Sequence, residues 1–229
     1  MLLEICVTSV EAALTAQNAG ADRIELCDNL SEGGTTPKYE VIKSCRKNLH
    51  IRLHVMIRPR PGNFFYSDPE LNQMKKEIEM SKELKVDGVV FGILTADKKV
   101  DIKRAKKLIE LSKPLKVTFH RAYDDTVEPL EALENIIECG ADILLTSGQK
   151  EKAIEGVDLI RLLNIRAHGR IEIMAGSGIN DKNVLEIATK TGIQSFHGSA
   201  KKINSANEIV YADMEMIRKM KSHLKKLEQ

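Results

Sequence analysis

Short apolar runs rich in β-branched residues alternate with amphipathic stretches along the whole chain. The short runs predict strands, and the stretches in which apolar residues recur three and four positions apart predict helices. The predicted strands are Leu2–Thr8, Arg23–Cys27, Ile51–Arg58, Gly88–Gly92, Lys116–His120, Ile143–Thr146, Ile171–Ala175 and Gln194–His197. The clearest predicted helices are Val10–Asn18, Pro69–Lys85, Ile102–Ser112, Pro129–Cys139 and Asn207–Leu227.

Each predicted strand is followed by a loop, a helix and then the next strand. Because every connection between strands contains a helix, the strands are expected to run parallel. Eight such units of roughly 28 residues predict a single-domain α/β protein over residues 1–229, a (β/α)8 TIM barrel. The alternative is an open doubly wound sheet, which would have fewer strands and a nearly all-apolar strand pattern.

The strands are not uniformly apolar, because polar and apolar residues alternate within several of them. Such alternation places one set of side chains against the helices and the other in the barrel axis. The polar set is expected inside, since helices packed on Arg or Glu would bury unpaired charge. This inward set is Glu4, Arg23, Glu25, Arg52, His54, His120, Glu172 and His197. We expect each inward Arg to lie near a Glu of a neighbouring strand.

Position along the strand separates two groups of these residues. Glu4, Arg23, Arg52 and Glu172 come early in their strands, where mutual charge pairing alone could explain them. Residues late in a strand lie at the barrel face where enzymes of this fold place their sites. The late group is Glu25, Cys27, Arg58, His120, Thr146, His197 and Ser199.

Small residues follow the last two predicted strands. Gly176, Ser177 and Gly178 form one loop, and Ser199 lies in the other. Backbone amides at these two places bind phosphate in many barrels, so the four residues are candidate anion ligands. The alternative is a tight turn that needs glycine for its backbone conformation.

Two further segments have competing interpretations. The loop 59–66 contains three aromatic residues and is interpreted as a lid over a bound ligand or as a subunit contact. The basic segment 218–226 is interpreted as the solvated face of the last helix rather than as a binding patch.

Composition excludes several classes of protein. Lys and Arg number 35 against 33 Asp and Glu, a net charge of +2 that argues against a nucleic-acid partner. Hydrophobic residues at 42% and charged residues at 30% are typical of a soluble globular chain. We find neither a basic leader before an apolar run nor an apolar stretch of membrane-spanning length, which predicts a cytoplasmic protein without a membrane partner.

The four cysteines carry the candidate metal chemistry. They are widely spaced without a C-x-x-C motif, which predicts reduced thiols in the cytoplasm. Cys6 and Cys27 fall late in adjacent strands with inward parity, near His54 and Met56, and sulfur with imidazole is the ligand set that Cu(I) prefers. The alternative is that both are small core residues, since buried cysteines usually are.

Several sequence blocks resemble the CutC family, in order from Glu4 to about Lys202. They are Ile24-Glu25-Leu26-Cys27, Gly33-Gly34-Thr35-Thr36-Pro37, Val55-Met56-Ile57-Arg58-Pro59-Arg60, Asp87-Gly88-Val89-Val90-Phe91-Gly92, Thr118-Phe119-His120-Arg121-Ala122, Leu145-Thr146-Ser147-Gly148 and Phe196-His197-Gly198-Ser199-Ala200. The resemblance implies a cytoplasmic (β/α)8 barrel with a part in copper homeostasis through Cu(I) binding by cysteines. It also implies a homodimer or a higher homo-oligomer. The chain departs from the family pattern at Thr35, Ser177 and Gly198.

Two functions therefore stay open. The first is copper homeostasis, with Cu(I) bound by Cys27 and Cys6. The second is an enzyme that acts on a small anionic or phosphorylated metabolite, with Arg58 and the loops after the last two strands holding the anion. In that enzyme Glu25 or His120 would be the general base and His197 the acid.

Overall fold

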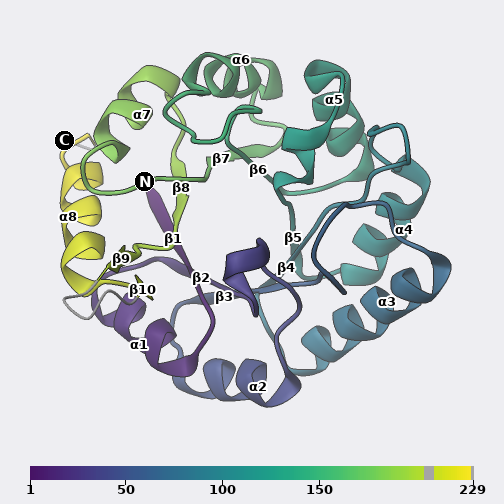
Figure 1. Cartoon of the computed structure of the whole chain (residues 1–229), viewed down its shortest axis with the longest axis horizontal. Coiled ribbons are helices and arrows are strands. Elements are labelled where there is room, and N and C mark those ends of the chain that lie inside the picture. Colours follow the sequence, from purple (N-terminus) through teal and green to yellow (C-terminus); the bar gives the residue numbers. More distant parts are fainter. Residues whose placement is uncertain (204–208, 228–229) are drawn as a thin grey trace.

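The predicted strands close on one another into a barrel. In the computed structural model, which describes residues 1–203 and 209–227, each strand pairs in parallel with the next and the last pairs with the first (Figure 1). The strands are β1 (Leu2–Val7), β2 (Arg23–Leu26), β3 (Arg52–Met56), β4 (Gly88–Phe91), β5 (Lys116–Phe119), β6 (Ile143–Thr146), β7 (Glu172–Ala175) and β8 (Ser195–Gly198). The predicted (β/α)8 TIM barrel is confirmed.

Helices surround the barrel as a ring (Figure 1). They are α1 (Val10–Asn18), α2 (Tyr39–Asn48), α3 (Asp68–Glu83), α4 (Ile102–Ser112), α5 (Pro129–Cys139), α6 (Val157–Ala167), α7 (Val184–Thr191) and α8 (Met214–Lys225). Local capping fixes where several of them begin. The Ser9 side chain accepts a hydrogen bond from the backbone N–H of Ala12 at the start of α1, and Ser67 with Glu70 forms a capping box at the start of α3.

The last helix is shorter than its apolar periodicity predicts. The prediction that it starts at Asn207 is wrong: α8 starts at Met214, where the Asp213 side chain accepts a hydrogen bond from the N–H of Met216. Ile209–Val210 forms β10, which pairs antiparallel with β9 (Lys202–Ile203). Two adjacent β-branched residues favour a strand over a helix, and Asn207 itself lies outside the described residues.

The main hydrophobic core lies between the barrel and its helices. Ile24 and Leu26 of β2 belong to this core, together with apolar residues of the surrounding helices. The intervening Arg23 and Glu25 are also buried but lie outside the apolar cluster. The alternation in the strands therefore separates an apolar outer face from a polar axis, as the sequence predicts.

The loop after β2 covers the centre of the barrel. Its 3₁₀ helix η1 (Leu30–Glu32) corresponds to the dark purple coil that lies over the barrel axis in Figure 1. Leu30 packs against Cys27, Met56 and Val90 inside the barrel. The backbones of Asp28 and Thr35 exchange two hydrogen bonds of 2.9 and 2.8 Å, so the loop is closed at its base above the late strand residues.

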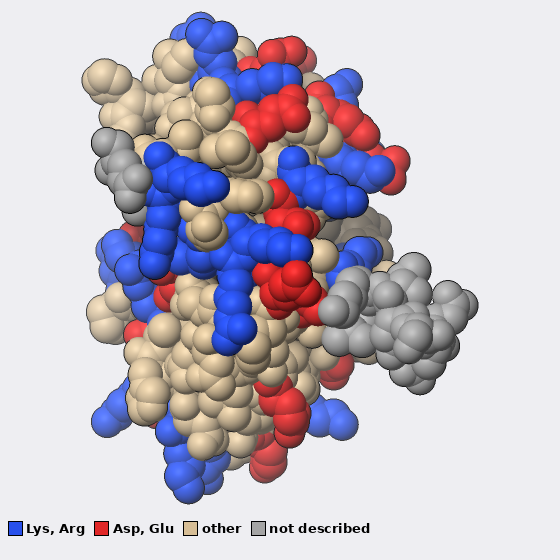
Figure 2. All heavy atoms as spheres, turned by 90° about the vertical axis from the view of Figure 1, so that its left-hand side faces the viewer, with Lys and Arg blue, Asp and Glu red and all other residues tan. Residues whose placement is uncertain are grey.

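The outer face of α8 is basic. Figure 2 shows Lys and Arg side chains gathered across the middle of this side of the molecule, with acidic residues between them. Helix α8 buries Ile217, Met220 and Leu224 and exposes Arg218 and most of its other basic residues, which agrees with a solvated helix face. In the described part of the chain, we find no helix with the length and apolar character that spanning a membrane requires.

Candidate functional site

A chain of ionic groups crosses the barrel interior. Glu4 of β1 lies opposite Arg23 of β2 on one side and opposite His197 of β8 on the other, because β8 closes the barrel against β1. Arg23 Nε donates to Glu4 Oε2, and His197 Nδ1 lies 2.7 Å from Glu4 Oε1. Burial opposes a charge on Glu4, but Arg23 and the His197 hydrogen bond outweigh it and hold the pKa of this carboxyl well below its usual range.

The other two residues of the early group lie elsewhere. Arg52 was predicted inside the barrel, and that prediction is wrong, because it is exposed at the start of β3. Glu172 has a side chain that is 40% exposed, and its Oε1 lies 3.9 Å from Arg23 Nη2. Both residues stand at the first position of a strand, where an inward parity does not by itself produce burial. Arg23 stands at the same position of β2 and is buried in its pair with Glu4.

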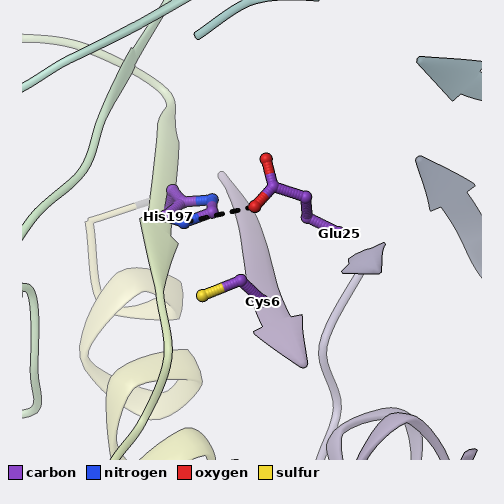
Figure 3. A group of neighbouring side chains, drawn as sticks. All are labelled: Cys6, Glu25 and His197. Atoms are coloured by element: carbon purple, nitrogen blue, oxygen red, sulfur yellow. Dashed lines mark ion pairs between the residues drawn. The ribbon is translucent and has the colours of Figure 1, made fainter. Parts of the chain in front are cut away.

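Three potential ligand atoms converge at the opposite end of the same interior. Cys6, Glu25 and His197 each offer one such atom, and these atoms all lie within 4.8 Å of one another. Figure 3 shows the three side chains pointing toward one another from β1, β2 and β8. Cys6 and Glu25 are directly opposite in the strand register, and His197 Nε2 lies 3.8 Å from Glu25 Oε2.

Cys27 adjoins this cluster through Glu25. Its thiol is completely buried and lies 3.3 Å from Glu25 Oε2, to which it donates a hydrogen bond. The loop after β2 packs on it closely, since a Cβ placed on Gly34 would lie 3.3 Å from Cys27 Sγ. The structure thus groups the two cysteines predicted as copper ligands with two residues predicted as an acid–base pair.

Burial and charge act in opposite directions in this group. Burial raises the pKa of the Cys27 thiol well above its usual range, and the neighbouring Glu25 adds to the effect. Burial also raises the pKa of Glu25. For His197, burial disfavours the imidazolium, but the carboxylate of Glu25 and the hydrogen bond to Glu4 contribute to a pKa well above the usual value.

Glycines in β4 and directly after β4 and β7 leave room for the inward histidines. A Cβ on Gly88 would lie 2.5 Å from His54 Nε2, and one on Gly92 would lie 2.6 Å from His120 Nδ1. A Cβ on Gly176 would lie 3.3 Å from His197 Cδ2. Sequence reasoning missed this pairing, although a glycine inside a strand is a recognised sign of close approach by another group.

His120 is a buried, neutral imidazole in this structure. Its Nδ1 accepts a hydrogen bond from the N–H of Ala122 at 3.2 Å, so the ring proton is on Nε2. That nitrogen is buried and has no partner among the described residues. Burial, joined by the positive charge of Arg58, lowers the pKa of His120 to about 3. Its role as a general base stays a prediction, and the lone pair that it would need is engaged by Ala122.

The lowered pKa of His120 makes the fold sensitive to acid. The ordinary value of 6.5 applies to the unfolded chain, so the unfolded state binds an additional proton as the pH falls from 6.5 toward 3. Between pH 7.5 and pH 5, we expect the free energy of unfolding to fall by about 2 kcal/mol less in His120→Gln than in the wild type. Urea unfolding at both pH values measures this difference in the free energy of unfolding, and His168→Gln, at an exposed position, is the control. If His120→Gln loses as much stability between the two pH values as the wild type does, burial does not lower the pKa of His120.

Arg58 joins the loops after β2 and β3. Its Nη1 donates to the carbonyls of Glu32 and Gly34 at 3.0 and 2.8 Å, and its Nη2 donates to Gly62 at 2.8 Å. The guanidinium also stacks 4.9 Å from the centroid of Phe64, whose ring contacts His120. Arg58 is therefore positioned at the barrel mouth as predicted, but most of its donors hold loop backbone. Its role in anion binding stays a prediction.

The predicted anion ligands lie in the segments that follow β7 and β8, and their role also stays a prediction. The Ser177 hydroxyl donates to the Glu151 carbonyl at 2.6 Å, and the Gly178 carbonyl accepts from Asn183 Nδ2 at 2.8 Å. Gly176 is buried, whereas Ser199 is half-buried and its carbonyl accepts from the N–H of Ala212. Ser177 and Gly178 both have positive φ angles, of 84° and 70°, so the turn interpretation accounts for part of this pattern.

The aromatic loop after β3 is only partly exposed. Tyr66 is fully buried in the core, Phe64 packs on Arg58 and His120, and Phe65 is 49% exposed.

Cys45 and Cys139 lie in α2 and α5 away from the barrel axis, and all four cysteines are free.

Comparisons with known proteins agree on one family. Residues 1–202 match the model of the CutC family. The chain is 51% identical over 201 residues to the family protein CutC of Bacteroides fragilis, covering 87% of this chain and 80% of that protein. It is 46% identical over 200 residues to the human copper homeostasis protein cutC homolog, covering 87% of this chain and 73% of that protein.

Solved structures resemble this chain at two levels. The crystal structure of the putative copper homeostasis protein CutC from Streptococcus agalactiae superposes with a TM-score of 0.83 at 36% identity, covering 86% of this chain and 98% of that one. Phosphoribosyl anthranilate isomerase from Thermotoga maritima superposes with a TM-score of 0.65 at 16% identity, covering 99% of both chains. The second likeness shows a shared barrel fold alone.

Proposed function

This chain belongs to the CutC family, and from that premise we propose that it acts in copper homeostasis by binding Cu(I) at the mouth of its barrel. The proposed ligands are the thiolates of Cys6 and Cys27, with His197 Nε2 as a third donor. The observation that carries the proposal is the position of two buried cysteines beside Glu25, Cys6 in β1 and Cys27 directly after β2. The imidazole of His197 lies 3.8 Å from the same Glu25 oxygen that Cys27 contacts. Soft sulfur and imidazole donors in a site shielded from water suit Cu(I).

His197 is held in the orientation that a ligand needs. Its Nδ1 is engaged by Glu4, which leaves Nε2 facing Cys6 and Glu25. A histidine that ligates a metal commonly donates a hydrogen bond from its other ring nitrogen to a carboxylate, and this bond fixes the orientation of the ring. Glu4 and Arg23 would thus position a copper ligand without contacting the metal.

The proposal is tested by the affinity of the purified protein for Cu(I). We expect Cys6→Ser and Cys27→Ser each to weaken Cu(I) binding by at least about 10-fold, because losing a direct ligand costs no less than losing an outer-shell partner. A titration against a competing Cu(I) chelator measures this change. Cys139→Ser, a buried cysteine on α5, is the matched control and should bind as the wild type does. Unchanged affinity in both ligand variants would reject the proposal.

The alternative enzyme is not favoured by the comparisons. The two relatives reported above, at 51% and 46% identity, carry a family name and a copper-homeostasis name, and the superposed enzyme shares only the fold. The predicted cytoplasmic location and the homodimer or higher homo-oligomer stay predictions.

A further inference from the structure

We infer that the barrel mouth also forms a Zn²⁺ site from Cys6, Glu25 and His197. This inference deepens the proposed function by adding a second metal at the same mouth, and it uses a donor that Cu(I) binding does not need. Among the described residues, these three form the group of potential ligand atoms whose separations are all within 4.8 Å.

The geometry of the three side chains is close to that of a zinc site. Ligand atoms at ordinary zinc distances of about 2.0 to 2.3 Å in a tetrahedron stand about 3.3 to 3.8 Å apart. His197 Nε2 and Glu25 Oε2 are already 3.8 Å apart, so small side-chain rotations complete the set. With three protein ligands, the fourth position is open to water or to the thiol of Cys27, which lies 3.3 Å from Glu25.

The charges of the site also match a divalent ion. A Cys6 thiolate and a Glu25 carboxylate together carry two negative charges, which neutralise the charge of Zn²⁺ in a largely buried site. Glu25 is 3% exposed, and its Oε1 has no hydrogen-bond partner among the described residues. A buried carboxylate with an unpartnered oxygen is costly, and a cation bound to Glu25 would offset the charge of that carboxylate.

The donor set distinguishes this metal from copper. Sulfur, imidazole and carboxylate together suit Zn²⁺, whereas Cu(I) prefers the sulfur and imidazole donors alone. Arg23 offsets the charge of Glu4, which in turn holds His197, so the surroundings add no further net charge to the three ligands. Because Zn²⁺ and Cu(I) share Cys6 and His197, the two metals would exclude each other.

The experiment measures both metals on the same variants. Metal-stripped protein is titrated with Zn²⁺ against a chromogenic chelator and, separately, with Cu(I) against a Cu(I) chelator. We expect Glu25→Gln to weaken Zn²⁺ binding by at least about 10-fold. Cu(I) binding should not weaken, because Glu25 is not a Cu(I) ligand and the loss of its charge beside Cys27 favours the thiolate. Glu77→Gln, a half-buried carboxylate on α3, is the control and should change neither affinity.

The possible results separate this inference from the proposed function. Zn²⁺ binding that is absent in the wild type or equal in Glu25→Gln overturns the zinc site, whatever the copper titration gives. Loss of Cu(I) binding in Cys27→Ser with no zinc binding supports the copper proposal alone. If Glu25→Gln does not fold, the absorption spectrum of the wild type with added Co²⁺ in place of Zn²⁺ tests the site instead. A thiolate-to-cobalt charge-transfer band that Cys6→Ser abolishes supports the site, and absence of the band overturns it.

Discussion

Replacing Glu4 by Gln is expected to lower the free energy of unfolding by about 3 to 5 kcal/mol at neutral pH. Glu4 is completely buried and is the partner of both Arg23 and His197. The amide has the shape of the carboxylate but no charge, so Arg23 would stay buried without its closest counterion and would keep the more distant, partly exposed Glu172 at 3.9 Å. Urea unfolding followed by circular dichroism measures the loss.

Two comparisons test this explanation. Glu134→Gln removes an exposed pair with Arg170 and should cost much less than Glu4→Gln, because exposed ion pairs contribute little to stability. The double variant Glu4→Gln with Arg23→Met removes both charges of the buried pair, and we expect it to be more stable than Glu4→Gln alone. A double variant that loses the full sum of the two single effects would contradict the role assigned to the pair.

The effect of Glu4 also has a defined pH window. Its pKa in the folded protein lies below the ordinary value of 4.5, so the stabilisation is present at neutral pH and is lost as the pH falls below 4.5. The difference between wild type and Glu4→Gln should therefore narrow in acid. A difference that widens in acid would show that the shift of this pKa has the opposite sign.

The barrel is predictable because the two-residue alternation of the strands and the helical periodicity of the segments between them indicate the same architecture. Alternation in β2 separates Ile24 and Leu26 from Arg23 and Glu25, and the helices between strands require parallel pairing. The start of α8 was not predictable in this way, because an apolar periodicity continues through residues where the Asp213 cap and the β9–β10 pairing decide the structure. Periodicity states which face is apolar and does not state where a helix begins.

The candidate site was predicted in its parts but not in its grouping. Parity and strand position identified Cys6, Glu25 and His197 separately, each with a different role. Their convergence depends on the closure of β8 against β1, which sets Glu4 opposite His197 and is a long-range feature of the sheet. Arg52 shows the converse, since its parity is inward but the barrel end where it stands is exposed to water.

Gly88→Ala is expected to lower the free energy of unfolding by about 3 kcal/mol, the upper end of the usual cost of overpacking. The added Cβ would lie 2.5, 2.6 and 2.7 Å from three atoms of the His54 ring. His54 is 1% exposed, and because side chains in a closely packed interior have little room to shift, the ring cannot easily move away from the added methyl group. The midpoint of urea unfolding measures the loss, with Gly198→Ala of β8 as the matched control.

The control and a second-site change separate overpacking from other effects of the methyl group. At Gly198 the nearest atom to an added Cβ is the carbonyl oxygen of Ile179 at 3.2 Å, so we expect Gly198→Ala to cost clearly less than Gly88→Ala. Combining Gly88→Ala with His54→Ser shortens the opposing side chain and should restore part of the stability, because the two residues are in contact. Additive losses in this pair would mean that the glycine is required for the backbone of β4 rather than for the space that His54 occupies.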